Sequence, residues 1–153
     1  AANQIYDGMH SIIRQLRPGS LDNLGLSETI KDEMNTWQSQ HPALKVNLII
    51  KGNIDLLGEV VNINVYRIIQ EAMNNVVKHA KASTIKISLL KTKDSLKIEC
   101  IDDGKGFDLK ILRKTKQFGL MGIKERTQSL NGNFDIKSSA NNGTHITIVI
   151  PTK

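Results

Sequence analysis

The stretch EVVNINVYRIIQEAMNNVVKH, residues 59–79, decides the fold that the rest of the chain builds around. At about 100° per residue, Glu71, Asn75 and Lys78 fall together on one face of a helix. The apolar side chains share another face: Val65, Ile69, Ala72, Met73 and Val76. The pattern therefore predicts one long amphipathic helix that buries its apolar face in a core and presents an acid, an amide and an amine elsewhere.

The segments around this helix carry further helix, strand and turn signals. Before it, the sequence predicts a helix over Ser27–Gln40 with Ser27 as its N-cap, then a strand over Leu44–Ile50. After it, the sequence predicts two hairpins with a short helix, Gly119–Leu130, between them. The hairpin strands are expected at residues 84–90, 96–102, 133–138 and 144–150. This order predicts an α+β, two-layer sandwich with helices on one face of a mixed, mostly antiparallel sheet.

Two other segments have a special character. Asn3–Leu16 repeats apolar residues at helical spacing, but no capping signal precedes it. We interpret it as a helix cut from a longer chain. Residues 103–118 are rich in Gly and Lys with little periodicity, which predicts a long loop of the kind that is often functional or mobile.

Composition narrows the class of protein. The 153 residues, 39% hydrophobic, are typical of one globular domain and exclude collagen-like and disordered classes. The single cysteine, Cys100, excludes a disulfide framework and cysteine-rich zinc sites. No apolar run approaches membrane-spanning length. Residues 1–77 carry 6 basic and 8 acidic side chains, whereas residues 78–153 carry 15 and 7. The basic second half predicts an anionic partner, either a nucleic acid or a small phosphate compound.

Glu71, Asn75 and Lys78 on the long helix have the chemistry of a Mg-nucleotide site. Mg²⁺ takes hard oxygen ligands, keeps several waters and needs only one or two protein ligands beside phosphate oxygens. Asn75 offers one such oxygen, Lys78 a charge for a phosphate, and Glu71 a group that can polarise a nucleophile. The alternative is an ordinary solvated face of an amphipathic helix.

Two glycine-containing segments follow. In Asp102-Asp103-Gly104-Lys105-Gly106-Phe107, directly after a strand, the glycines allow close backbone approach and Asp102 can accept from an exocyclic amine such as that of adenine. Phe118–Ile123 opens a helix whose amides can meet phosphates. The alternatives are a plain turn and an ordinary helix start. A P-loop is absent, and the third Rossmann glycine is replaced by Leu109.

Taken in order, four segments resemble the ATP-binding domain of sensor histidine kinases, in the GHKL superfamily shared with DNA gyrase, the heat-shock chaperone ATPase and MutL. Gln70–Ala80 resembles the N box, Asp102–Phe107 and Gly119–Arg126 resemble the two glycine boxes, and Gly143-Thr144 resembles the last short motif. The resemblance covers about residues 44–151 and implies the Bergerat fold, a two-layer α/β sandwich.

The resemblance also implies roles for individual residues. Asn75 is expected to bind Mg²⁺, Asp102 the adenine amine, and Glu71 to polarise or position. Residues 108–118 are expected to form the ATP lid. The catalytic set is then Glu71, Asn75 and Lys78. The nucleotide-binding set is Asn75, Lys78, His79, Asp102, Gly104, Gly106, Phe107, Gly119, Leu120, Gly122, Ile123, Gly143 and Thr144.

The residue sequence of the N box, together with Leu16-Arg17-Pro18 before Leu24-Gly25-Leu26, resembles that of kinases of the nitrate-sensor, hexose-phosphate-sensor and DesK/LiaS type. This implies the end of a dimerisation hairpin at residues 1–17, a connector and first catalytic helix at 18–43, and the ATP-binding core at 44–153. The four histidines do not fit a phosphoacceptor, so the acceptor is expected outside this chain: His10, His41, His79 and His145.

The implied function is transfer of the γ-phosphoryl group of Mg-ATP to a histidine on that dimerisation helix, and from there to a response regulator. The implied location is the cytoplasm, with a parent chain that can be anchored in the inner membrane. Three alternatives stay open. They are an ATP-sensing module without kinase activity, a stand-alone ATPase, and a nucleic-acid binder supported only by the pI of about 9.5. Six aromatic side chains offer little for base stacking, so we expect no nucleic-acid partner.

Overall fold

The computed structural model describes residues 21, 24–106, 108 and 120–152. The helices are α3 (Gly25–Gln40), α4 (Glu59–Asn75), the π-helical η1 (Val76–Ala80) and α6 (Leu120–Ser129). The strands are β1 (Lys45–Lys51), β2 (Thr84–Lys91), β3 (Ser95–Asp102), β4 (Asn133–Ser138) and β5 (Thr144–Pro151). The expected helix over Asn3–Leu16, the expected lid apart from Asp108, and the candidate residues Phe107 and Gly119 lie outside the described residues.

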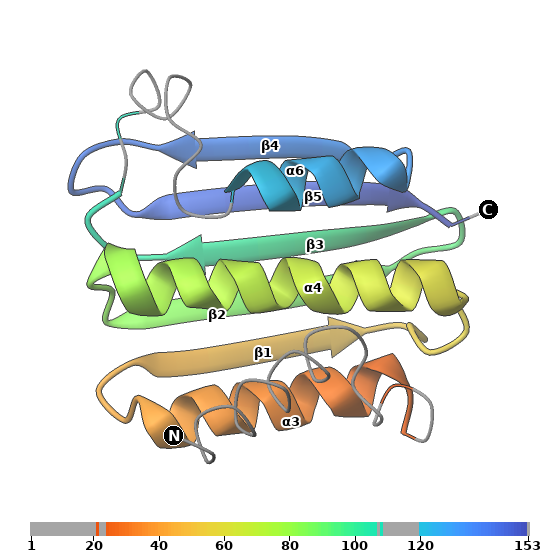
Figure 1. The fold of residues 1–153 in the computed structure, drawn as a ribbon, viewed down its shortest axis with the longest axis horizontal. Helices are drawn as coiled ribbons and strands as arrows, with labels where there is room; N and C mark the ends of the chain where they lie inside the picture. The colour runs from red at the N-terminus through yellow and green to blue at the C-terminus, as the bar shows by residue number, and fades with distance from the viewer. Residues whose placement is uncertain (1–20, 22–23, 107, 109–119, 153) are drawn as a thin grey trace, which may run out of the picture.

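The five strands form one mixed sheet in the order β1-β2-β3-β5-β4 (Figure 1). Only β1 and β2 are parallel, because the chain between them crosses over through α4. The pairs β2–β3, β3–β5 and β4–β5 are antiparallel. The expected mixed, mostly antiparallel sheet is therefore confirmed, as are both hairpins.

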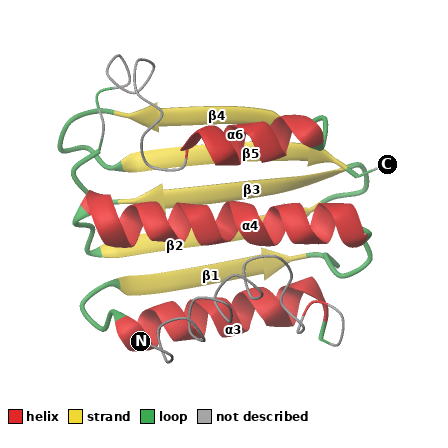
Figure 2. Ribbon diagram, viewed as in Figure 1, coloured by secondary structure: helices red, strands yellow, loops and turns green. Residues whose placement is uncertain are grey.

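The helices form a second layer on one face of the sheet (Figure 2). Strands β2, β3 and β5 bury every second side chain against them, as a half-buried sheet should. The apolar face predicted for the long helix is buried: Val65, Ile69, Ala72, Met73 and Val76. The other face of the sheet carries no helix among the residues that the structure describes. The expected two-layer α+β sandwich is confirmed.

The start of α3 differs from the prediction. The helix begins at Gly25, and Ser27, expected as its N-cap, lies inside the first turn. The capping oxygens come from Asp55, which accepts from the Ser27 backbone N–H at 2.9 Å and from Ser27 Oγ at 3.2 Å. Ser27 was wrong as a cap because a carboxylate 28 residues further along the chain satisfies the orphan donor instead.

The end of the long helix also differs from the prediction. The α-helix stops at Asn75, and Val76–Ala80 continues as a π-helical turn that ends at Lys81 with φ of 49°. Each residue of an i→i+5 turn rotates less about the axis than a residue of an α-helix. The direction expected for Lys78 from a 100° step therefore does not hold beyond Asn75.

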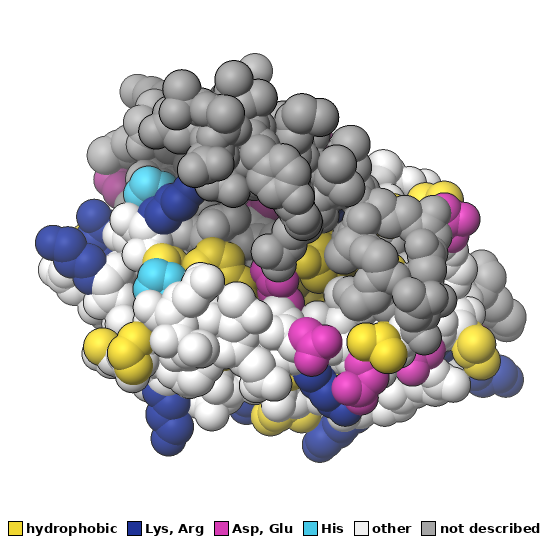
Figure 3. Space-filling view, turned by 60° about the horizontal axis from the view of Figure 1, so that its bottom comes forward, with side chains coloured by type: hydrophobic (Ala, Val, Ile, Leu, Met, Phe, Trp, Pro, Cys, Tyr) yellow, Lys and Arg dark blue, Asp and Glu magenta, His cyan; other side chains and the backbone are white. Residues whose placement is uncertain are grey.

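Charge is distributed unevenly over the surface. In Figure 3, which brings the α3 side of the molecule forward, acidic side chains gather near the middle and Lys and Arg side chains lie around the edge. No helix in the described part of the chain is long and apolar enough to cross a membrane.

Candidate nucleotide-binding site

A pocket lies between the carboxyl end of α4, the start of α6 and the adjoining ends of β3 and β5. It brings Asn75 and Asp102 together from the helix layer and the sheet. Its lining is otherwise mostly apolar: Ala72, Val76, Ala80, Ile85, Cys100, Leu120, Thr144 and Ile146. Motif reasoning identified the polar members and missed most of the apolar wall. The signals that could have indicated it are the apolar face of the long helix, which carries Ala72 and Val76, and the alternation of buried residues along the strands, which includes Ile85, Cys100 and Ile146.

Asn75 is unusual because its polar side chain is buried without a full set of partners. It is only 8% exposed, and its Nδ2 has no hydrogen-bond partner among the described residues. A buried donor left unsatisfied costs about 1–3 kcal/mol. Rotation of the amide by 180° exchanges this nitrogen for the carbonyl oxygen. The side chain is therefore available to a ligand that enters the pocket.

The two aspartates at the end of β3 have different roles. Asp103 Oδ1 accepts from the backbone N–H groups of Ser83 at 2.8 Å and Thr84 at 2.9 Å, and these bonds lower the pKa of Asp103. Asp102 Oδ1 accepts from the Gly104 N–H at 2.8 Å, but burial raises the pKa of Asp102. Asp103 thus fastens the start of β2, while Asp102 faces the pocket.

Three glycines hold the backbone around Asp102. A Cβ on Gly104 would collide with Ala80, and one on Gly143, where φ is 73°, would collide with the Asp102 carbonyl. A Cβ on Gly106, where φ is 67°, would collide with the Ser139 carbonyl. The Lys105 N–H donates to the Ala80 carbonyl at 2.7 Å and so joins this loop to the end of η1. Positive φ and close approach both require glycine here.

Glu71 and Gly122 meet where α4 and α6 pack together. A Cβ at position 122 would lie 3.1 Å from both carboxylate oxygens of Glu71. Burial raises the pKa of Glu71, and the charges of Arg126 and Arg67 oppose that effect. Glu71 precedes Asn75 by one turn of α4 and is not among the residues that line the pocket.

The remaining expected residues are divided between the pocket and its surroundings. Leu120 and Thr144 line the pocket, and Ile123 is fully buried in the core. Thr144 Oγ1 and Ser138 Oγ lie 2.9 Å apart, which orients the hydroxyl at the pocket wall. Lys78 is exposed and His79 half-buried, and neither lines the pocket.

The donor set fits Mg²⁺ and an adenine nucleotide. Asn75 supplies a hard oxygen ligand from a buried position, and Mg²⁺ can complete its shell with waters and phosphate oxygens. Asp102 supplies an acceptor for an exocyclic amine, and the apolar wall suits a purine ring. The open space between the lining side chains is about 10 Å³, which holds about one water molecule. A purine therefore enters only if a wall moves, and Leu120 belongs to that wall.

A second hollow of about 380 Å³ reaches Asp102, Gly143 and Thr144 from the neighbourhood of Lys137 and His145. It is the larger of the two, but it does not contain Asn75. The smaller pocket combines the amide and the carboxylate, so we take it as the candidate site.

The sequence of this chain is similar to known proteins. The profile of the family described as "Histidine kinase-, DNA gyrase B-, and HSP90-like ATPase" matches residues 61–153. The chain is 39% identical over 140 residues to "Signal transduction histidine-protein kinase/phosphatase DegS" of Brevibacillus brevis, covering 92% of this chain and 36% of that protein. It is 35% identical over 139 residues to the protein of the same name in Bacillus subtilis, covering 88% and 36%. The chain thus spans about a third of the length of these relatives.

Solved structures share the fold. The "Histidine kinase domain from Erythrobacter litoralis EL346 blue-light activated histidine kinase" has a TM-score of 0.71 at 16% identity, covering 84% of this chain and 61% of that one. The "Catalytic domain of histidine kinase ThkA" has a TM-score of 0.66 at 15% identity, covering 84% and 93%. The family profile spans more than half of the chain and every residue that lines the pocket. This chain therefore belongs to the histidine kinase-, DNA gyrase B- and HSP90-like ATPase family.

Proposed function

We propose that this domain binds Mg-ATP and presents its γ-phosphoryl group to a histidine on the dimerisation helix of the same protein, in a two-component signalling pathway. The observation that carries the proposal is Asn75, whose buried amide lacks a partner in the same pocket as the carboxylate of Asp102. The curated relatives are named as histidine-protein kinase/phosphatases, which favours a kinase over the other activities of the family.

Each residue of the site would have a role that follows from its position. Asp102 would accept the exocyclic amine of adenine, and Gly104, Gly106 and Gly143 keep the backbone around it in place. Asn75 would hold Mg²⁺, which supplies charge neutralisation to the phosphates when bound. Phosphoryl transfer depends mainly on such positioning and neutralisation. Glu71, one turn along α4, would orient the groups that meet at the terminal phosphate.

Several parts of the proposal concern the whole protein. We propose that Lys78, His79, Gly119 and Gly122 contact phosphates and that residues 108–118 act as a lid. Residues 1–17 would end a dimerisation hairpin, 18–43 would connect it to the catalytic domain, and 44–153 would form the ATP-binding core. The partners would be ATP and ADP, the acceptor helix and a response regulator, and the place of action the cytoplasm.

The test is nucleotide-induced stabilisation with a matched pair of variants. A ligand at 100 times its Kd stabilises a folded protein by about 2.7 kcal/mol, so Mg-ADP should raise the melting temperature of the parent. Asp102→Asn should abolish the rise, because the carboxylate that faces the pocket is lost. Asp103→Asn should melt lower than the parent but keep the rise, because Asp103 only fastens β2. Failure of Mg-ADP to stabilise the parent would refute the proposal.

The second candidate is a stand-alone ATPase, and the environment of Glu71 favours it. Burial raises the pKa of this carboxyl, and a raised pKa suits a general base for water. Steady hydrolysis of ATP that Glu71→Gln abolishes would support this activity. Phosphotransfer to a separately supplied acceptor helix, without such hydrolysis, would support the kinase.

A further inference from the structure

Beyond the pocket, two arginines lie near Glu71 on the seam between α4 and α6, one on each helix. Arg67 precedes Glu71 by one turn of α4, and Arg126 follows Gly122 by one turn of α6. The two helices run antiparallel (Figure 1), and Gly122 lies against Glu71. Both arginines therefore extend from the Glu71–Gly122 contact toward the same end of the seam. Their charges both act on Glu71.

Arg126 has more hydrogen-bond donors than the described residues provide acceptors for. Its Nη1 donates to Asn64 Oδ1 at 3.4 Å, a long bond. Its Nε is buried and has no hydrogen-bond partner in the part of the chain that the structure describes. A guanidinium carries five N–H donors in a fixed fork, and a buried donor without a partner is costly.

Arg67 is held in place by a chain of hydrogen bonds that leads to α3. Its Nη1 donates to Gln70 Oε1 at 3.2 Å, and Gln70 Nε2 donates to the Tyr66 hydroxyl at 3.1 Å. The Tyr66 hydroxyl in turn donates to Glu33 Oε2 on α3 at 3.0 Å. Burial, and next the charge of Arg126, lower the pKa of Arg67. At the seam itself the two arginine charges exceed the single charge of Glu71, because Glu33, the second carboxylate of this network, is reached only through Gln70 and Tyr66.

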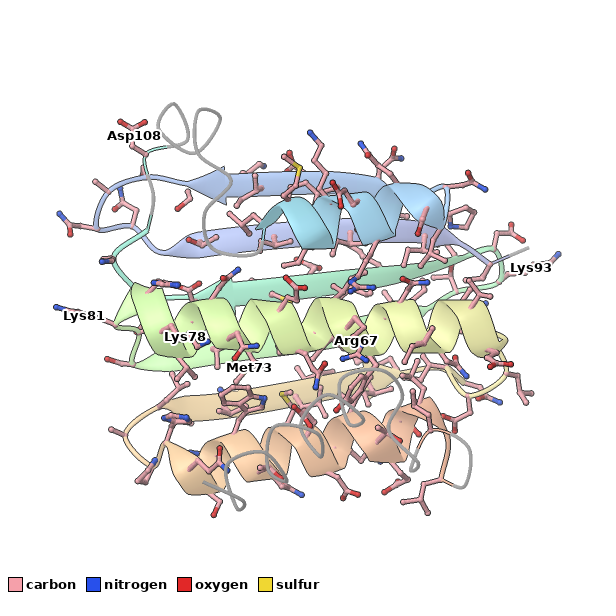
Figure 4. All side chains as sticks on the ribbon, viewed as in Figure 1. Arg67, Met73, Lys78, Lys81, Lys93 and Asp108 are labelled. Atoms are coloured by element: carbon pink, nitrogen blue, oxygen red, sulfur yellow. The ribbon has the colours of Figure 1, made fainter. Side chains whose placement is uncertain are left out.

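The cluster of Arg67, Glu71 and Arg126 follows the candidate site along α4. Along α4 the order is Asn75, then Glu71 one turn earlier, then Arg67 one turn earlier again. Lys78 lies in the other direction, in η1, and Figure 4 shows Arg67 and Lys78 well separated along the helix. The positive charge of Arg67 and the positive charge of Lys78 are therefore alternative candidates to bind the phosphate that lies furthest from the adenine.

We propose that Arg67 and Arg126 form an oxyanion site that takes the terminal phosphoryl group of a nucleoside triphosphate bound at the Asn75–Asp102 pocket. This inference rests on the proposed function. Arginine suits the role because its planar fork matches the geometry of phosphate and keeps its charge at all working pH values. The unpartnered Nε of Arg126 would gain an acceptor, and the positive excess around Glu71 would be neutralised.

The experiment compares two ligands that differ in one phosphate. The dissociation constants of Mg-ADP and of the non-hydrolysable analogue Mg-AMP-PNP are measured by calorimetry on this chain, and their ratio reports the terminal phosphate. In Arg126→Gln and in Arg67→Gln we expect that ratio to shift about tenfold against the triphosphate, as loss of a charge-assisted hydrogen bond should do. Arg126→Lys, which keeps the charge and loses the fork, should fall between.

Controls separate this inference from a structural role and from the proposed function. Lys124→Gln removes one positive charge from an exposed position of the same helix and should leave the ratio unchanged. An equal loss of affinity for both nucleotides, or an unchanged ratio, in the two arginine variants would overturn the inference. The inference would also be overturned if Lys78→Gln removed the preference for Mg-AMP-PNP over Mg-ADP while both arginine variants kept it. If the parent chain did not bind Mg-ADP at all, that result would refute the proposed function rather than the role of the two arginines.

Discussion

Glu71 on α4 lies against Gly122 on α6, so closely that a Cβ at position 122 would be 3.1 Å from both carboxylate oxygens. This distance is tighter than an ordinary van der Waals contact, and the carboxylate would have to shift. The relationship couples a glycine of the second glycine box to an acid of the N box across 51 residues of sequence. It therefore gives a direct test of how the two helices pack beside the pocket.

Gly122→Ala should interact energetically with Glu71→Ala. Alanine favours a helix over glycine by up to about 1 kcal/mol, but in the parent the displaced Glu71 offsets that gain. Without the Glu71 carboxylate, the substitution should stabilise more, by at least about 0.5 kcal/mol. Urea denaturation of the four proteins of the cycle measures this difference, and simple additivity would contradict the contact.

Asn75 should be dispensable for stability and essential for Mg²⁺. Asn75→Ala removes a buried amide whose nitrogen has no partner, so the cost of the lost volume is offset by relief of an unsatisfied donor of about 1–3 kcal/mol. We expect the melting temperature to change by only a few degrees, while Mg²⁺ no longer improves nucleotide affinity. Asn74→Ala, the neighbouring amide on the same helix, is the control and should keep the Mg²⁺ dependence.

Gly143 should tolerate alanine poorly, and Gly58 provides the comparison. Both have positive φ, 73° and 92°, but a Cβ at Gly58 meets nothing within 4 Å, whereas at Gly143 it collides with the Asp102 carbonyl. Gly58→Ala should cost about 1 kcal/mol from backbone strain alone. Gly143→Ala should cost more than about 2 kcal/mol, because the turn that holds Asp102 must also move. Equal losses in chemical denaturation would mean that the close approach is not important.

The Glu99–His145 pair on the helix-free face should make stability depend on acid pH. His145 Nε2 lies 2.8 Å from Glu99 Oε2, and this hydrogen bond is the main reason that the pKa of Glu99 falls below its ordinary value near 4.5. A carboxyl with a lowered folded-state pKa stabilises above its unfolded pKa and loses that contribution as the pH falls through the folded value. Both side chains are partly exposed, so the contribution is at most about 1 kcal/mol.

Glu99→Gln should therefore be less stable than the parent at pH 7, and the two denaturation curves should converge as the pH drops below about 4.5. A difference that persisted undiminished at pH 2 would show that the substitution acts through packing instead.

Cys100 should report on opening of the pocket. The thiol is buried in the pocket wall, and burial raises its pKa to about 12. Because only the thiolate reacts, labelling by a disulfide reagent at pH 8 should be slow in the folded protein and fast in urea. If the native chain were labelled as fast as the unfolded one, the wall would not be closed as the structure shows it.

The sequence by itself determined those parts of the protein that depend on local periodicity. The apolar stripe of residues 59–75 identified the core face of α4, because helical geometry alone decides which side chains share a face. Alternation predicted the strands of both hairpins, and the turn residues Asn141–Gly143 marked the second one. The order of the motifs identified the family, and the adjacent acids Asp102 and Asp103 marked the end of β3.

Only the tertiary structure decided which atoms those residues face. It gave the capping of α3 to Asp55 rather than Ser27, turned Asp103 to the start of β2 and left Asp102 to the pocket. It also ended the α-helix at Asn75 with a π-helical turn and placed Gly122 against Glu71. The physical reason is that each of these contacts joins residues far apart in the chain or follows from competition among distant donors and acceptors. No local spacing encodes such a contact.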